Sequence, residues 1–161
     1  MSNLYSLFPD GQGYRFKNAV GDEYYAYFTP FTLQTEDNIP YETMSFGFEC
    51  KRVNPDKKQI YDERTKQTIA HIIKDYFDQN GDDALLYICL TNDGKARHRN
   101  IIFGKWFKEL GNEYERHRSK IETQDLDFFS SILVKSNNPK KKKIVNAFHY
   151  TIDFWFPYEE D

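Results

Sequence analysis

The sequence lacks the features that mark exported, membrane-spanning or disulfide-stapled proteins. It contains only two cysteines, Cys50 and Cys89, and each lies in a predicted strand, so we expect reduced, inert thiols. No apolar run approaches the roughly 20 residues that span a bilayer. Residues 1–13 lack the basic start and apolar core of a signal peptide. These absences predict a cytoplasmic protein without membrane contact.

An excess of either charge is also missing. Lys and Arg total 22 and Asp and Glu total 25, which leaves a net charge of −3. A protein that coats nucleic acid would be basic overall, so this balance excludes that class and leaves only a local basic patch open. The length of 161 residues predicts a single domain over residues 1–161. We expect residues 1–13 and 157–161 to be loosely ordered.

Signatures of metals, cofactors and common catalytic groups are missing as well. The histidines, His71, His98, His117 and His149, form no pair at ligand spacing with other donors. Residues 11–13 (Gly-Gln-Gly) precede a predicted strand, whereas a phosphate-binding loop follows a strand and opens a helix, so we expect a flexible lead-in. No Gly-x-Ser-x-Gly nucleophile motif occurs. The sequence therefore predicts no cofactor and no metal, and it favours a protein that is not an enzyme.

Aromatic residues, by contrast, are abundant at 17%, and Tyr and Phe favour half-buried sheets. Residues 14–19 and 23–29 flank a Val-Gly-Asp turn, which predicts a β-hairpin. A polar loop is expected over residues 34–41. Residues 43–53 then alternate between apolar and polar or small side chains, which predicts a strand with one buried face. Its apolar side chains are Met44, Phe46, Phe48 and Cys50.

The second half of the chain predicts helices separated by strands. An apolar stripe predicts a helix over about 62–79, with Asp62 as its N-cap and Asn80-Gly81 as its stop. Residues 84–90 are continuously apolar, which is typical of a central strand covered on both faces. The stripe consists of Ile69, Ile72, Ile73, Tyr76 and Phe77.

A second helix is predicted over about 95–110, and Trp106 lies in its apolar stripe, so we expect a buried ring. Residues 117–123 and 128–135 are weaker strand candidates. A third helix is predicted over about 139–155, although its β-branched and aromatic content leaves a strand open as the alternative.

These elements predict one α+β domain with the order βββαβαββα and about three helices. Consecutive strands followed by helices favour a two-layer arrangement, in which a mixed or antiparallel sheet carries the helices on one face.

The basic residues that follow a polar turn at Asp93 form the first candidate site. Ligands tend to bind at this end of a strand where neighbouring strands are parallel, and Lys95, Arg97 and Arg99 come next. Helical spacing turns Arg99 toward the core face, where a guanidinium needs a carboxylate or several carbonyls. One interpretation is a structural ion pair with Asp62 or Asp93. The other is an anion or phosphate pocket built by the three cations.

A run of lysines forms the second candidate site. Lys140, Lys141, Lys142 and Lys143 begin the third predicted helix, where cations oppose the helix dipole, so helix stability does not explain them. One interpretation is a solvated edge that discourages association. The alternative is contact with nucleic acid or an acidic partner.

Tyrosines cluster in the strand predicted over residues 23–29. Tyr25 and Tyr27 share one face and Tyr24 takes the other, so both faces are aromatic. Ordinary core packing with scattered surface tyrosines explains this pattern. A partner-binding face is the alternative, because tyrosine is enriched at interfaces.

A set of residues spread over most of the chain carries a resemblance to a known family. These residues are Asp62, Thr68-Ile69, Ile72-Ile73, Phe77, Tyr87-Ile88-Cys89, Asp93-Gly94, Arg99, Phe103, Trp106-Phe107, Asn138-Pro139 and Ala147-Phe148. In this pattern the chain resembles a family of small uncharacterised proteins from Bacteroidota that is catalogued only as a domain of unknown function. The resemblance supports the fold and implies a bacterial, cytoplasmic setting, but it implies no activity.

Three functional hypotheses follow. The first is a non-enzymatic binding or regulatory module that acts through protein–protein contacts. The second is a phosphate- or nucleic-acid-directed protein, in one form a weak hydrolase, that uses Arg97 and Arg99 or the lysine run. The third is a small-molecule binder with a pocket between sheet and helices.

Overall fold

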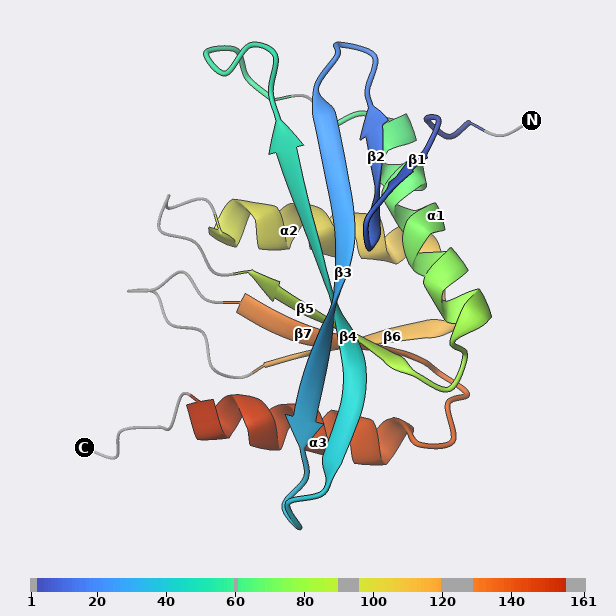
Figure 1. Ribbon diagram of the computed structural model, residues 1–161, viewed down its shortest axis with the longest axis vertical. Helices are drawn as coiled ribbons and strands as arrows, with labels where there is room; N and C mark the ends of the chain where they lie inside the picture. The colour runs from blue at the N-terminus through green and yellow to red at the C-terminus, as the bar shows by residue number, and fades with distance from the viewer. Residues whose placement is uncertain (1–2, 60, 90–95, 120–128, 156–161) are drawn as a thin grey trace.

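The computed structural model describes residues 3–59, 61–89, 96–119 and 129–155 (Figure 1). Within these residues, seven strands form one sheet in the order β1-β2-β3-β4-β5-β7-β6. Only β4 and β5 pair in parallel, and the other neighbours are antiparallel. The elements are β1 (Phe8–Asp10), β2 (Gly13–Lys17), β3 (Glu23–Gln34), β4 (Pro40–Lys51), α1 (Glu63–Gln79), β5 (Ala84–Cys89), α2 (Ala96–Phe107), the 3-10 helix η1 (Lys108–Leu110), β6 (Tyr114–Arg118), β7 (Phe129–Lys135) and α3 (Lys141–Trp155).

The α+β class, the mixed sheet and the order of the main elements are confirmed. Two segments contain more strand than expected. The N-terminal segment forms β1, and Tyr5 there is buried and stacks on Phe16. The loop expected over residues 34–41 is also shorter, because β3 runs to Gln34 and β4 begins at Pro40.

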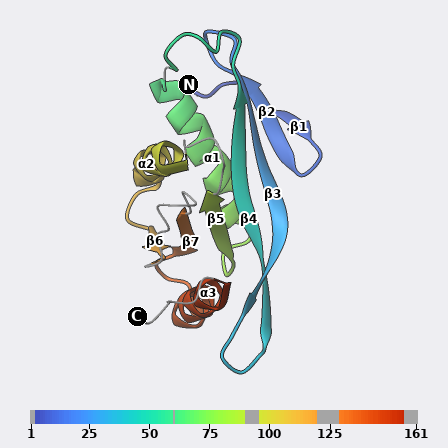
Figure 2. The ribbon, with the colours of Figure 1, turned by 90° about the vertical axis from the view of Figure 1, so that its left-hand side faces the viewer.

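The helices are divided between the two faces of the sheet (Figure 2). Leu85 belongs to the core that α1 and α2 cover, whereas Leu86 belongs to the core that α3 covers. Successive side chains of a strand point to opposite faces, so β5 is buried on both. β7 is likewise buried continuously over residues 130–134. The arrangement therefore differs from the two-layer prediction, because the β5–β7–β6 end of the sheet has apolar side chains on both faces and needs a helix on each.

Trp106 lies against this sheet as expected. Its side chain is 2% exposed and its ring packs 5.0 Å from that of Phe48, centroid to centroid. Phe103, one turn earlier in α2, stacks on Tyr87 of β5 at 3.9 Å. The strand β5 is interior, between β4 and β7, although β4 is the middle strand of the seven. No helix within the described residues combines the length and apolar character needed to cross a membrane.

Candidate functional site

Asp62 occupies the N-cap of α1, as predicted. Its side chain accepts a hydrogen bond of 2.6 Å from the backbone N–H of Thr65 and one of 2.5 Å from the hydroxyl of Tyr5. Burial raises the pKa of Asp62, but these hydrogen bonds outweigh it and hold the pKa below its ordinary value. The structure thus gives this carboxylate a local structural role.

The basic residues around α2 are only partly described. Arg99 lies half-buried in α2. Burial raises the pKa of Tyr61, and the charge of Arg99 partly offsets this rise. Arg97 belongs to α2, but its side chain lies outside the described residues, as do Asp93 and Lys95 entirely. The choice between an ion pair and an anion pocket at Arg99 therefore stays a prediction.

Sequence reasoning missed a second arginine beside α2. The Arg116 guanidinium of β6 donates to Asn100 Oδ1 at 2.7 Å and to Ser131 Oγ at 3.1 Å, and it lies over the ring of Phe103. Burial, aided by the charge of Arg118, lowers its pKa. Among the described residues, the Arg116 cation is therefore held by two uncharged oxygen acceptors and by the face of an aromatic ring. The charged neighbours of Arg116 in β6 make the sequence look like an exposed strand, although Arg116 is half-buried.

The lysine run does not act as one unit. The ammonium of Lys141 lies 2.9 Å from a carboxylate oxygen of Glu115, and this ion pair holds the pKa of Glu115 below its ordinary value. Lys140, Lys142 and Lys143 are exposed. Lys141 therefore ties α3 to β6, and three lysines remain on the surface for contact with solvent or a partner.

The tyrosine-bearing strand is β3, and its two faces differ. Tyr24 is fully buried and stacks on Phe16. Tyr25 and Tyr27 lie on the other face, where their rings stack at 5.2 Å, and the Tyr27 ring lies close over Gly47. The Arg15 guanidinium covers the Tyr25 ring at 4.3 Å. These side chains form a flat aromatic surface on the half-exposed side of β2–β4.

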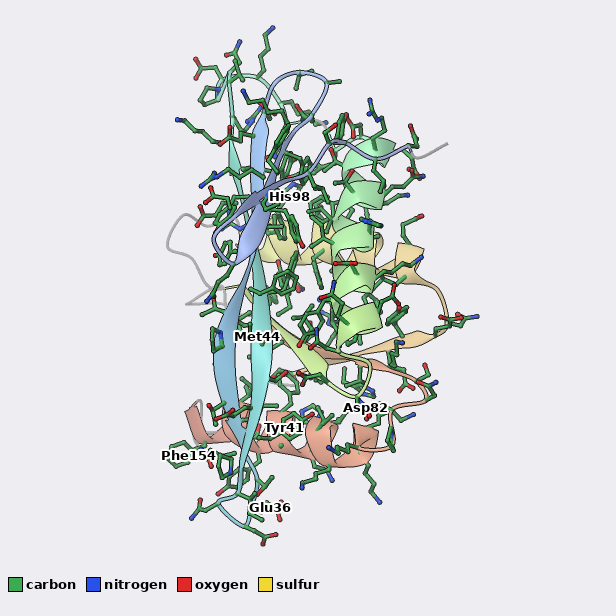
Figure 3. The ribbon with its side chains drawn as sticks, turned by 45° about the vertical axis from the view of Figure 1, so that its right-hand side comes forward. Glu36, Tyr41, Met44, Asp82, His98 and Phe154 are labelled. Carbon is green, nitrogen blue, oxygen red and sulfur yellow. The ribbon has the colours of Figure 1, made fainter. Side chains whose placement is uncertain are left out.

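A cleft of about 400 Å³ lies between the β1–β2 hairpin, the middle of the β3–β4 ribbon and the C-terminal half of α1. Apolar and aromatic side chains line it together with polar ones. The first group is Pro9, Tyr14, Phe28, Met44, Ile72 and Tyr76, and the second is Gln12, Asp75, Gln79 and Asn80, with Gly11 and Gly13 completing the wall. Figure 3 labels Met44, about halfway along β4. A concave site of this size with a few polar groups is the usual form of a binding pocket.

Local sequence explains how each wall forms. Gly11 is the first residue of the two-residue β1–β2 turn and has a φ of 59°, which favours glycine there. Gly13 pairs with Tyr27 so closely that a Cβ atom would overlap the Ala26 carbonyl. On α1, Ile72, Asp75, Tyr76 and Gln79 share one side because they are three or four residues apart.

Tyr76 and Phe28 form the floor of the cleft, and the Tyr76 side chain is held in place and uncharged. The Tyr76 hydroxyl donates to the Ala84 carbonyl at 2.8 Å, and its ring stacks on Phe28 at 5.2 Å. Burial and the charge of Asp83 raise its pKa. The floor of the cleft is thus a rigid, uncharged aromatic surface.

A second hollow of about 390 Å³ adjoins the cleft. Both share Gln12 and Phe28, and the second is also lined by Tyr25, Tyr27, Thr29 and Glu49. The cleft faces α1, whereas the stacked tyrosines of the hollow lie on the opposite face of β3, so the two hollows adjoin at the β1–β2 turn, where Gln12 lies.

In the described parts of the chain, no group of three or more His, Cys, Asp or Glu side chains is placed to hold a metal ion. Cys50 is a free thiol whose pKa burial raises. The cleft therefore offers shape, aromatic surface and one carboxylate, which suit binding.

The comparisons with known proteins reach the family level. A model described as a family of unknown function (DUF6169) matches residues 61–150, more than half of the chain. No curated protein and no solved structure matches the chain significantly. The match runs from Tyr61, beside the N-cap of α1, through α2 and β7 into α3. The chain therefore belongs to this family of unknown function.

Proposed function

We propose that the protein is a non-enzymatic binding module of the bacterial cytoplasm that holds a segment of a protein partner at the cleft. The observation that carries this proposal is the cleft itself, with its rigid Phe28–Tyr76 floor and polar rim. The adjoining hollow supports a peptide as the ligand, because an extended chain can pass from the cleft around Gln12 into the second hollow, whereas a compact molecule would occupy only one of them. Tyrosines at its far end are typical of interface cores.

The edge of β3 that extends beyond β2 is a poor place for a partner to add a strand. Alternate backbone amides of a strand point to the same edge. At this edge the N–H of Phe28 donates to the Gln12 carbonyl, and that of Gln34 donates to the Thr151 hydroxyl. Pro30 lies between them and has no N–H to offer. We therefore assign recognition to side chains that enter the cleft.

A selection of random peptides displayed on phage against the full chain tests this proposal. Gln79→Trp places a large ring on the exposed rim of the cleft, and it should weaken each enriched peptide about tenfold or more. Lys74→Trp is the matched control, because Lys74 is exposed on the same helix and does not line the cleft. Its affinity should stay within about twofold of the unaltered chain.

Two results would overturn the proposal. One is a selection that enriches no peptide. The other is a set of peptides that bind Gln79→Trp as tightly as the unaltered chain while circular dichroism shows that both variants keep their fold. Binding only of a free small molecule in the cleft would replace the peptide by a metabolite.

The exposed lysines favour a second candidate function, contact with nucleic acid or another phosphate-bearing partner. Lys142 and Lys143 extend from the first turn of α3, beside exposed Lys140. Retention of the chain on a DNA or RNA column should fall with salt and should drop after Lys142 and Lys143 are replaced by Ser. Unchanged retention would leave Arg97 and Arg99 as the remaining cations for this function, and no retention would exclude it.

A further inference from the structure

We infer that the partner segment places a lysine or arginine side chain in the cleft; this inference rests on the proposed function. A basic side chain fits because it combines an apolar stem with a cationic head. The cleft offers a complementary surface for each part, as the following contacts describe.

The charge of the lining is complementary to a cation. Asp75 is the charged side chain of the cleft and Glu49 that of the adjoining hollow, and neither set of lining residues includes Lys, Arg or His. Arg15, which covers the Tyr25 ring beside the hollow, is already paired with Asp10 and Glu23. A cation in the cleft therefore meets the Asp75 carboxylate and no basic lining residue.

The backbone of α1 adds to this charge. The cleft lies at the C-terminal half of the helix, where the dipole is negative. Helices usually place basic residues there, but the last turn of α1 has none, and Asp75 and Asp78 lie close to it. This arrangement opposes helix stability, so a positively charged ligand would improve the local electrostatics.

The apolar wall suits the stem of a lysine or arginine. Met44 and Ile72 contribute aliphatic surface, and the stacked rings of Phe28 and Tyr76 present aromatic surface beside it. A cation that lies over the face of such a ring gains further attraction from its π electrons. The amide group of Gln79, which donates to Asp75 at 3.1 Å, holds that carboxylate at the rim.

The experiment uses four N-acetyl, N′-methylamide amino acids as probes: lysine, arginine, norleucine and glutamate. Norleucine is the uncharged control for lysine, because it keeps the stem and lacks the ammonium. The reporter is the ¹³C-labelled methyl group of Met44 in the full chain. Only Met1 shares this residue type, so a Met44→Leu spectrum identifies the signal.

We expect the lysine and arginine probes to shift the Met44 signal with at least about threefold higher affinity than norleucine, and added salt to reduce this difference. Asp75→Asn should abolish the advantage, since it keeps the side-chain shape and removes the charge. Asp78→Asn is the matched control, because Asp78 is exposed on the same helix and does not line the cleft.

The inference is overturned if norleucine or glutamate binds as well as lysine, if no probe shifts Met44, or if Asp75→Asn and Asp78→Asn behave alike. The phage selection tests the proposed function independently of this probe experiment. Enriched peptides that lack Lys and Arg and still depend on Gln79 would keep the binding module and reject the basic side chain.

Discussion

Replacing Trp106 by alanine tests the packing of α2 on the sheet. The Trp106 side chain is 2% exposed, so truncation removes nearly all of a large buried ring. Such core substitutions cost about 3–5 kcal/mol. The ring centroid lies 5.0 Å from that of Phe48 and 5.9 Å from that of Tyr61. Because these aromatic pairs are also lost, we expect a loss of stability toward the upper end of that range.

Urea denaturation followed by far-UV circular dichroism measures this loss, because the signal does not depend on the deleted indole. Phe154→Ala is the control. Its side chain is 76% exposed, so its free energy of unfolding should change by less than about 0.5 kcal/mol. If Trp106→Ala is unfolded without urea, Trp106→Phe gives the graded measurement. A loss below about 1 kcal/mol in Trp106→Ala would show that the ring is not seated in the core.

Two further substitutions test local structure. Asp62→Ala should cost about 1–2 kcal/mol near neutral pH, because the carboxylate caps α1. The folded pKa of Asp62 is lowered, so its stabilisation is present above the ordinary carboxyl pKa and is lost as pH falls through the lowered value. Urea midpoints of the two chains should therefore converge in acid, and a constant gap would contradict this. Gly13→Ala should cost about 1–3 kcal/mol, since its Cβ would overlap the Ala26 carbonyl. Gly81→Ala, whose nearest neighbour lies at 3.6 Å, is the control, and equal losses by thermal unfolding would refute the overlap.

Local signals were sufficient to predict most helices and strands. The cap at Asp62 and the apolar stripe of α1 depend on residues three or four apart, and the structure confirms both. The alternation of Met44, Phe46 and Phe48 likewise depends on the period of a single strand; Phe46 is buried in the core under α1 and α2, and Met44 and Phe48 pack against that core. These features need no knowledge of what lies opposite them.

The depth of a charged side chain is harder to predict, as Arg99 and Arg116 demonstrate. Helical spacing gives the direction of Arg99, and the structure leaves it half-buried. Arg116 lies among Glu115, His117 and Arg118, a pattern typical of an exposed edge strand. It is half-buried because α2 packs over its guanidinium, which bonds to Asn100 and lies beside Gly104, where a Cβ atom would meet it. That packing is a tertiary contact, and no local period contains it.

The cleft lies beyond local reasoning for the same reason. Its walls come from the β1–β2 turn, β3, β4 and α1, and each contributes residues whose own patterns have ordinary structural explanations. The sequence predicts a flexible lead-in at Gly11 and Gly13, because a two-residue turn before a short strand gives little periodic signal. The unusual placement of Asp75 and Asp78 at the negative end of α1 is the one trace that the sequence holds, since it opposes the helix dipole without a compensating base. The inferred basic side chain would relieve this conflict between charge and backbone, whereas the apolar patterns that build the fold give no sign of the cleft.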